Sequence, residues 1–149
     1  MNDRFQSFTV LITKIARNIK RIKTEEMKEF DLKGPHVSCI YYLYKENGLT
    51  ATKLKEMCGE DKAAISRSID FLEQNGFIYS LDDKKKKYNA VLRLTKKGES
   101  AGALLANKID GVLEKASAGL TEENRKILYQ SLYLISNNLD NLIDNNKNE

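Results

Sequence analysis

The sequence predicts a mainly α-helical fold that carries one small β-hairpin. Three observations indicate this class. Apolar residues recur every three or four positions through most of the 149 residues, as they do on amphipathic helices. Gly59 separates two short helical patterns, where a tight turn between two helices is expected. After Gly76 the apolar period changes to about two, which is typical of strands.

The first predicted helix covers residues 4–29 and is strongly amphipathic. Its basic residues are expected on the solvated side. Pro35 then fits the first position of a second, aromatic-rich helix at 35–46, because its missing N–H is not needed there. Asn47 and Gly48 end that helix. The apolar face of the first helix consists of Phe5, Phe8, Leu11, Ile12, Ile15, Ile19 and Ile22.

The chain is organised around residues 50–76. Thr50 is expected to cap a short helix at 51–58, and Asp61 to cap a second helix that ends at Asn75. Small, hydrogen-bonding and cationic side chains near the start of the second helix suit a DNA major groove, although an ordinary helical hairpin explains the spacing equally well. Its inner face holds Ile65, Ile69 and Leu72, and its outer face holds Lys62, Ala63, Ser66, Arg67 and Asp70.

A basic β-hairpin is predicted directly after this helix. Residues 77–81 and 88–95 alternate apolar and polar positions, and Leu49 is expected to add a single-residue bridge to the same sheet. The order helix, turn, helix and basic hairpin is that of a winged helix-turn-helix, whose wing reaches phosphates or the minor groove. Alternatively, the charged tip is only a solvated turn that does not contact nucleic acid. Four consecutive lysines form that tip: Lys84, Lys85, Lys86 and Lys87.

Two further helices are predicted at 96–118 and from 122 to about 144. Thr95 and Thr121 are expected to cap them, and Gly119 separates them. Together with the first helix they carry more aliphatic surface than a small core can bury, which is typical of an interface. We therefore expect residues 1–34 and 98–149 to form a dimerisation region and residues 35–97 a DNA-binding region, within one structural domain.

Charge and composition indicate the class of binding partner and the cellular compartment. The net charge is +4, and residues 61–97 alone hold nine basic against five acidic side chains, which suits a polyanion. Cys39 and Cys58 lie far apart in sequence and both fall on apolar helix faces, so two buried, reduced thiols are expected. The chain has neither an apolar run of ~20 residues nor a signal-peptide pattern. A cytoplasmic protein without a membrane partner is expected.

Four segments of the sequence form a set of matching motifs: Gly48-Leu49-Thr50, Asp61-Lys62-Ala63-Ala64-Ile65-Ser66-Arg67, Leu72-Glu73-Gln74-Asn75-Gly76-Phe77 and Val91-Leu92-Arg93-Leu94-Thr95-Lys96-Lys97-Gly98. Together they resemble the MarR family of bacterial winged-helix transcriptional regulators. The helix order and the chain length agree as well, so the resemblance covers nearly the whole chain. The sequence departs from the family in the wing tip, where lysines stand in place of the usual arginines. A lysine holds phosphate as a point charge but lacks the planar fork that reads bases.

The resemblance implies a homodimer that represses transcription from a pseudopalindromic operator and is released by a small, often aromatic, effector. By position, Lys62, Ala63, Ser66 and Arg67 would meet the major groove, and Lys84–Lys87 the flanking backbone. Arg93 would brace the wing or contact phosphate. An effector cleft would be lined by Phe8, Tyr41 and Tyr44, although aromatic residues at such positions are more often plain core.

Other functions fit the sequence less well. An enzyme is not expected, because the sequence shows no nucleophile–base pair and no glycine-rich phosphate loop. No cofactor is expected. A zinc sensor is not expected either, because such a site needs several histidines and His36 is the single histidine of the sequence. A dimeric adaptor that binds protein through its winged helix is an alternative, which the basic 61–97 segment disfavours. A redox-sensing regulator that uses Cys39 or Cys58 is another, and it would require an exposed thiolate of low pKa.

Overall fold

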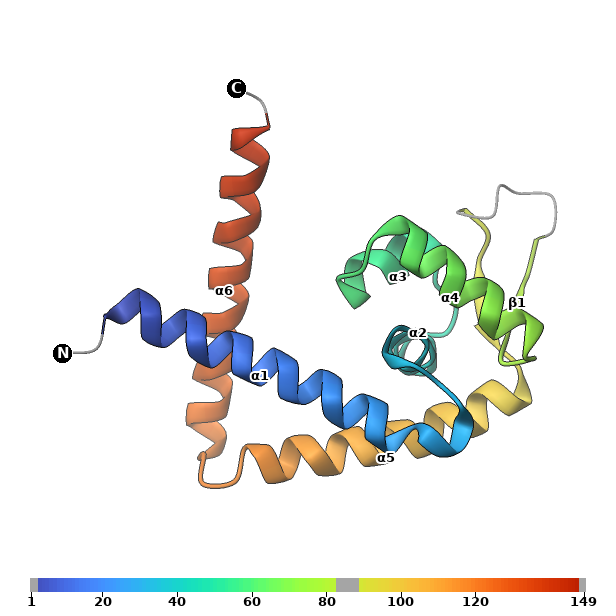
Figure 1. Cartoon of the computed structure of the whole chain (residues 1–149), viewed down its shortest axis with the longest axis horizontal. Coiled ribbons are helices and arrows are strands. Elements are labelled where there is room, and N and C mark those ends of the chain that lie inside the picture. Colours follow the sequence, from blue (N-terminus) through green and yellow to red (C-terminus); the bar gives the residue numbers. More distant parts are fainter. Residues whose placement is uncertain (1–2, 83–88, 148–149) are drawn as a thin grey trace. The chain divides into compact units, whose positions relative to one another are not determined.

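The computed structural model describes residues 3–82 and 89–147, and it confirms a mainly helical chain with one two-stranded hairpin (Figure 1). The chain divides into two compact units, residues 1–110 and 111–149. In chain order the elements are α1 (Arg4–Glu26), a 3-10 turn (Lys28–Phe30), α2 (Gly34–Lys45), α3 (Ala51–Cys58), α4 (Lys62–Gln74), β1 (Ile78–Ser80), β2 (Leu92–Leu94), α5 (Lys96–Ala116) and α6 (Glu122–Asn146).

Helix α1 ends three residues earlier than predicted. It stops at Glu26, and Met27, which fits the apolar period, is buried in the core instead of extending the helical stripe. The chain then makes a 3-10 turn and passes through Asp31, whose φ of 55° lies in the left-handed region. That turn brings Leu32 into the core and leads into α2, which begins at Gly34, one residue before the predicted start.

The first unit buries one continuous core beneath α2, α3, α4 and the hairpin. The predicted caps are confirmed: Thr50 Oγ1 accepts a hydrogen bond from the Lys53 N–H (3.2 Å), and Asp61 Oδ1 from the Ala64 N–H (2.7 Å). These side chains satisfy backbone donors that the first turn of a helix leaves without partners. The caps therefore fix where α3 and α4 begin. The core includes Val37, Cys39, Ile40, Leu43, Leu54, Ile65, Ile69, Leu72, Phe77, Ile78, Leu92 and Leu105.

The hairpin strands are shorter than the predicted 77–81 and 88–95. They pair antiparallel over three positions, with Tyr79 opposite Arg93 at the centre. A hydrogen bond from the Leu81 N–H to the Val91 carbonyl (2.9 Å) extends the pairing by one position toward the tip. The chain bends at Ala90, directly before Val91. The predicted bridge of Leu49 is confirmed by two hydrogen bonds with Leu92, of 3.2 and 2.9 Å.

Thr95 and Gly98 hold the base of the hairpin against the end of α4. Thr95 Oγ1 donates to the Gly76 carbonyl (2.6 Å) and accepts from the Gly98 N–H (3.1 Å), so it caps α5 as predicted. A Cβ at Gly98 would collide with the Phe77 carbonyl oxygen, so only glycine permits this approach. Lys97 Nζ donates to the Asn75 carbonyl (2.7 Å). These contacts fix the hairpin beside α4.

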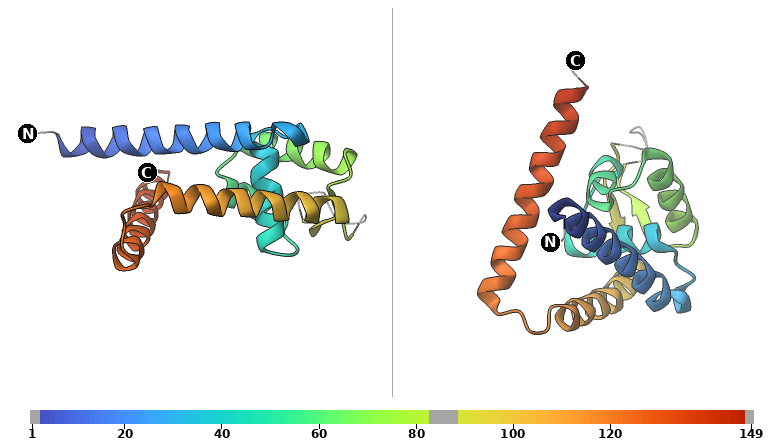
Figure 2. Two further views of the ribbon diagram at one scale, coloured as in Figure 1. Left: turned by 90° about the horizontal axis from the view of Figure 1, so that it is seen from below. Right: turned by 60° about the vertical axis from the view of Figure 1, so that its left-hand side comes forward.

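Helix α6 follows a turn at Gly119, whose φ is +89°. Thr121 Oγ1 accepts from the Asn124 N–H (3.1 Å), which confirms the predicted cap, and the helix continues two residues past the predicted Asp144. The right panel of Figure 2 shows α6 as one uninterrupted helix. None of its described residues is buried. Its large apolar side chains therefore face solvent within the unit formed by residues 111–149.

Candidate nucleic-acid interface

Helix α4 has one buried and one exposed face. Ile65, Ile69 and Leu72 are 0–1% exposed, which confirms the predicted inner face. On the other side, Lys62, Ala63 and Arg67 are exposed and Ser66 is half-buried. The four predicted DNA-contacting residues therefore lie on one accessible face, at the N-terminal half of a helix anchored by its apolar side. This is the arrangement by which a helix can enter a major groove.

A hollow of about 600 Å³ lies beside this face, between the start of α2 and α4. The His36 ring stacks on Phe71, with 4.1 Å between ring centroids and 3° between planes. Its Nδ1 accepts from the Lys33 N–H (3.2 Å), so the proton of the neutral ring is on Nε2. Burial, and then the charge of Lys33, lower the pKa of His36. The hollow is lined by Asp31, Lys33, Pro35, His36, Ala64, Arg67, Ser68 and Phe71.

Sequence reasoning gave no binding role to Lys33 and only excluded zinc chemistry for His36. The structure brings both beside Arg67, which is about thirty positions away in the chain. No periodic pattern joins the two segments, because the contact is between two different helices. The hollow extends the cationic surface of α4 toward the N-terminus of α2, where helix dipoles favour anions.

The hairpin contributes one described candidate residue. Lys84, Lys85, Lys86 and Lys87, which form the predicted wing tip, lie outside the described residues. Arg93 is half-buried on β2, and its Nε has no hydrogen-bond partner within the described ranges. Its guanidinium packs near the backbone of Gly48, within 4 Å of where a Cβ would stand. Gly48 has a φ of +92°, which favours glycine, and the arginine lies beside this turn at the base of the hairpin.

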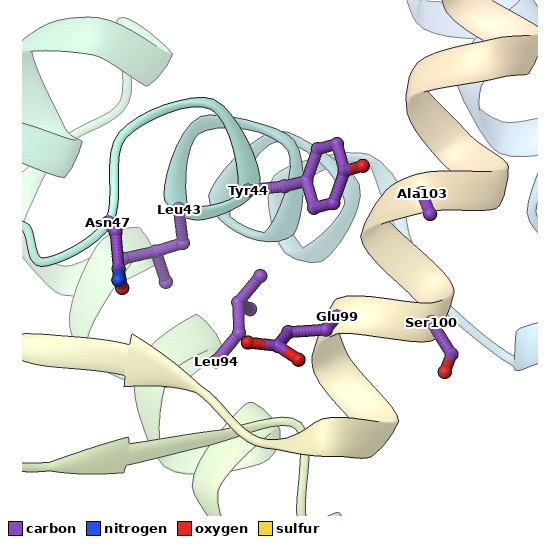
Figure 3. Close-up of a pocket in the computed structure, with 7 residues that line it drawn as sticks. All are labelled: Leu43, Tyr44, Asn47, Leu94, Glu99, Ser100 and Ala103. Atoms are coloured by element: carbon purple, nitrogen blue, oxygen red, sulfur yellow. The ribbon is translucent and has the colours of Figure 1, made fainter.

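The predicted effector residues do not converge on one cavity. Tyr44 borders a hollow of about 460 Å³ between the end of α2, β2 and α5, and Figure 3 shows its ring reaching toward α5. Tyr41 packs against the core instead, edge-on to Tyr42 with 5.5 Å between ring centroids. Phe8 is exposed on α1 and does not line this hollow. The lining residues are Leu43, Tyr44, Asn47, Leu94, Glu99, Ser100 and Ala103.

The two cysteines differ from the prediction of two separate buried thiols. Cys39 is buried on α2, but Cys58, the last residue of α3, is only half-buried. Interaction with Cys39 lowers the pKa of Cys58, whereas interaction with Cys58, together with burial, raises the pKa of Cys39. The separation of nineteen positions concealed this interaction, because α2 and α3 meet only in the folded chain. Within residues 3–82 and 89–147, no group of three or more potential ligands is arranged to hold a metal.

No helix in the described part of the chain is both long and apolar enough to cross a membrane.

The chain is similar to known transcriptional regulators. The model of the MarR family matches residues 32–87, which contain α2–α4 and the start of the hairpin. The uncharacterized HTH-type transcriptional regulator YybA of Bacillus subtilis (strain 168) is 30% identical over 126 residues, which cover 85% of this chain and 84% of YybA. The similarity therefore extends well beyond the matched segment, into the terminal helices.

Solved structures match over nearly the whole chain. A MarR family transcriptional regulator from Listeria monocytogenes, complexed with 26mer DNA, has a TM-score of 0.79 at 27% identity over 93% of this chain and 90% of that one. A Staphylococcus aureus MarR in complex with salicylate and kanamycin has a TM-score of 0.76 over 90% and 91% of the two chains. Its 14% identity indicates a shared fold.

Proposed function

This chain belongs to the MarR family of DNA-binding transcriptional regulators, and we propose that it works as a homodimeric repressor that a small aromatic effector releases from its operator. The outer face of α4 is the observation that carries the proposal. It places small, hydroxyl and cationic side chains on an exposed helix surface whose opposite side is fully buried. No catalytic step is part of this function, since the family consists of regulators.

Each residue of that face has a proposed role at the operator. Arg67 has the length and the planar donors to read a guanine edge, while Ala63 and Ser66 allow the helix backbone to approach the bases closely. Lys62 and the wing lysines Lys84–Lys87 would neutralise phosphates. For Arg93 we favour bracing of the wing over phosphate contact, because its guanidinium packs near the Gly48 turn.

A homodimer is supported by the exposed apolar surface of the terminal helices. Leaving so many large side chains in water is unfavourable, and a second copy would cover them by self-complementary packing. We propose that residues 1–34 and 98–149 form this dimerisation region and that residues 35–97 hold the DNA. In a two-fold dimer the two α4 helices would then lie about 34–36 Å apart, one turn of DNA. On α6 the exposed apolar residues include Ile127, Leu128, Leu134, Leu139, Leu142 and Ile143.

The hollow beside Tyr44 is the proposed effector site. Its volume of about 460 Å³ falls within the ordinary range of small-molecule pockets, and an aromatic ring and an aliphatic side chain border it. Figure 3 shows the Glu99 carboxylate pointing in from α5. That carboxylate would accept a hydrogen bond from a phenolic hydroxyl and would repel an anionic group. Tyr41 and Phe8 would act there only after a change of conformation.

Electrophoretic mobility shift of the DNA upstream of its own gene, at low and moderate salt, tests the proposed function. We expect a shift at low salt that weakens steeply as salt rises, since phosphate contacts release counterions. A scrambled duplex of equal length is the control for specificity. Absence of any shift at low salt would favour the adaptor that binds protein through its winged helix.

A further inference from the structure

The ammonium of Lys97, in the first turn of α5, is bound at the end of α4. Its Nζ donates to the Asn75 carbonyl (2.7 Å), which belongs to a residue twenty-two positions away in the chain. The same Nζ lies over the Phe77 ring, 4.3 Å from its centroid, where the face of the ring attracts a cation. Two independent contacts therefore hold this ammonium beside the segment that joins α4 to β1.

Helix α4 has no basic residue in its own last turn. The last carbonyls of a helix lack partners within it and carry the negative end of its dipole, so a cation is favourable there. Asn75 is the C-cap of α4, and Lys97 supplies this cation from another helix. Gly98 permits the approach, because a Cβ there would collide with the Phe77 carbonyl oxygen. The start of α5 therefore lies directly against the end of α4 (Figure 1).

These contacts close the base of the hairpin. The chain leaves α4 at Asn75, passes through β1 and β2, and reaches α5 after Thr95. Thr95 Oγ1 donates to the Gly76 carbonyl (2.6 Å) and Lys97 Nζ to the preceding carbonyl, so two successive carbonyls are bound from the start of α5. Joining the entrance of the hairpin to its exit restricts pivoting of the hairpin against α4.

We propose that Lys97 is a positioning residue for DNA recognition: its ammonium holds α4 and the hairpin at the angle at which both contact one duplex. This role rests on the proposed function, in which α4 reads bases and the wing holds phosphates. Lys97 belongs to the basic segment 61–97, whose charge alone would assign it to the DNA backbone. Its charge is instead directed at Asn75 and Phe77.

The neighbouring lysine provides a matched control. Lys96 is exposed like Lys97 and lies in the same turn of α5, but its side chain makes no hydrogen bond, ion pair or ring contact within residues 3–82 and 89–147. Lys96→Met and Lys97→Met leave the same net charge, and only the second removes the contacts to α4. Lys97→Arg is the conservative variant, because a guanidinium can donate to the same carbonyl and lie over the same ring.

Fluorescence anisotropy with the duplex upstream of its own gene, titrated at several salt concentrations, tests the role. Lys97→Met should bind at least several-fold more weakly than Lys96→Met, and Lys97→Arg should bind like the wild type. The salt dependence of Lys97→Met should equal that of the wild type, because no phosphate contact is lost, whereas Lys62→Met should reduce the slope by about 1. Equal affinities of the two methionine variants, or a slope reduced by about 1 with Lys97→Met, would overturn the proposal.

A double-mutant cycle separates positioning from a simple loss of folded protein. Replacing the four wing lysines at 84–87 by glutamine should cost less affinity in the Lys97→Met background, because a displaced wing no longer holds phosphate. The cost of Arg67→Ala should be the same in both backgrounds. A purely structural role of Lys97 would leave both losses additive, so additivity at the wing would overturn the proposal.

Proton NMR of the free wild-type protein tests the contact without DNA. The ring current of Phe77 should move the ε-methylene protons of Lys97 upfield of those of Lys96. Coincident chemical shifts would overturn the proposed contact, and this result does not depend on any variant folding. Failure of the wild type to bind the duplex would instead contradict the proposed function, and the chemical shifts would still decide whether Lys97 holds the end of α4.

Discussion

Helices α4 and α6 are built alike but end in opposite environments. Each begins with a capping side chain, Asp61 or Thr121, and each carries an aliphatic stripe at helical spacing. The α4 stripe is 0–1% exposed, whereas Leu128, Leu139 and Leu142 of the α6 stripe are 43–61% exposed and its Leu132 and Ile135 are only half-buried. Amphipathicity therefore tells which face of a helix needs a cover, but it does not tell what provides the cover. For α4 the same chain does, and for α6 we propose a second copy.

The largest expected effect comes from placing negatively charged side chains in the aliphatic stripe of α6. Leu128 and Leu142 lie on the same side of the helix at about 3.6 residues per turn, and both are exposed in the protomer. The double variant Leu128→Asp/Leu142→Asp should give a folded monomer whose operator affinity falls about 10²-fold or more, because two linked recognition helices become one. Sedimentation velocity and anisotropy measure both effects.

Tyr133→Asp is the matched control for the charged double variant. Tyr133 is 71% exposed and lies on the opposite side of α6, so the same charge there should leave both the dimer and the affinity intact. A double-aspartate variant that stays dimeric would show that the α6 stripe is not the interface.

A large-to-small change in each region compares their contributions to stability. Leu54→Ala removes a 0% exposed side chain from the core beneath α3 and should cost about 2–5 kcal/mol, since a cavity remains. Leu134→Ala on α6 should cost far less within the protomer and should act through dimerisation. Urea unfolding at two protein concentrations separates these effects. If both variants lost the same free energy of unfolding at both protein concentrations, the proposed difference between the core and α6 would be wrong.

Arg67→Ala tests the exposed face of α4 without disturbing its buried face. If Arg67 reads a base edge, the loss should be about 1–3 kcal/mol of operator binding, with little loss on a scrambled duplex. Arg21→Ala is the control, because Arg21 is an exposed α1 residue paired with Glu25 at 3.1 Å. Anisotropy titrations give both values. Unchanged operator affinity would mean that α4 does not read DNA through this residue.

The smallest expected effect is a dependence of folding stability on pH through His36. Since burial and Lys33 hold the pKa of His36 below its usual 6.5, the unfolded chain takes up the proton first as pH falls. Stability should therefore be full above that value and should decline as pH drops below it, toward the folded pKa. His36→Gln should flatten this decline, because the chain has no other histidine. Melting temperatures at pH 7.5 and about pH 5.5 measure it, and a steeper decline in the variant would contradict the assignment.

The bounds of an element were predicted best where a capping side chain stands at its start and a glycine follows its end. Helix α3 matches its predicted 51–58 bounds because Thr50 caps its start and Gly59 takes a left-handed conformation after its end. The predicted end of α1 was wrong, since Met27 continues the apolar period but turns into the core. The strands were predicted too long because alternation persists in residues that the sheet does not pair.

By itself, the sequence determined the class of the fold, the inner and outer faces of α4 and the caps of α3, α4, α5 and α6, because each depends on local spacing or on one side chain beside its own helix. Only the tertiary structure decided which distant residues touch. It stacked His36 on Phe71 and placed Tyr44 across from Glu99. Such contacts arise from packing between elements, and the period of a helix or strand marks its packed face without identifying the residues that it packs against.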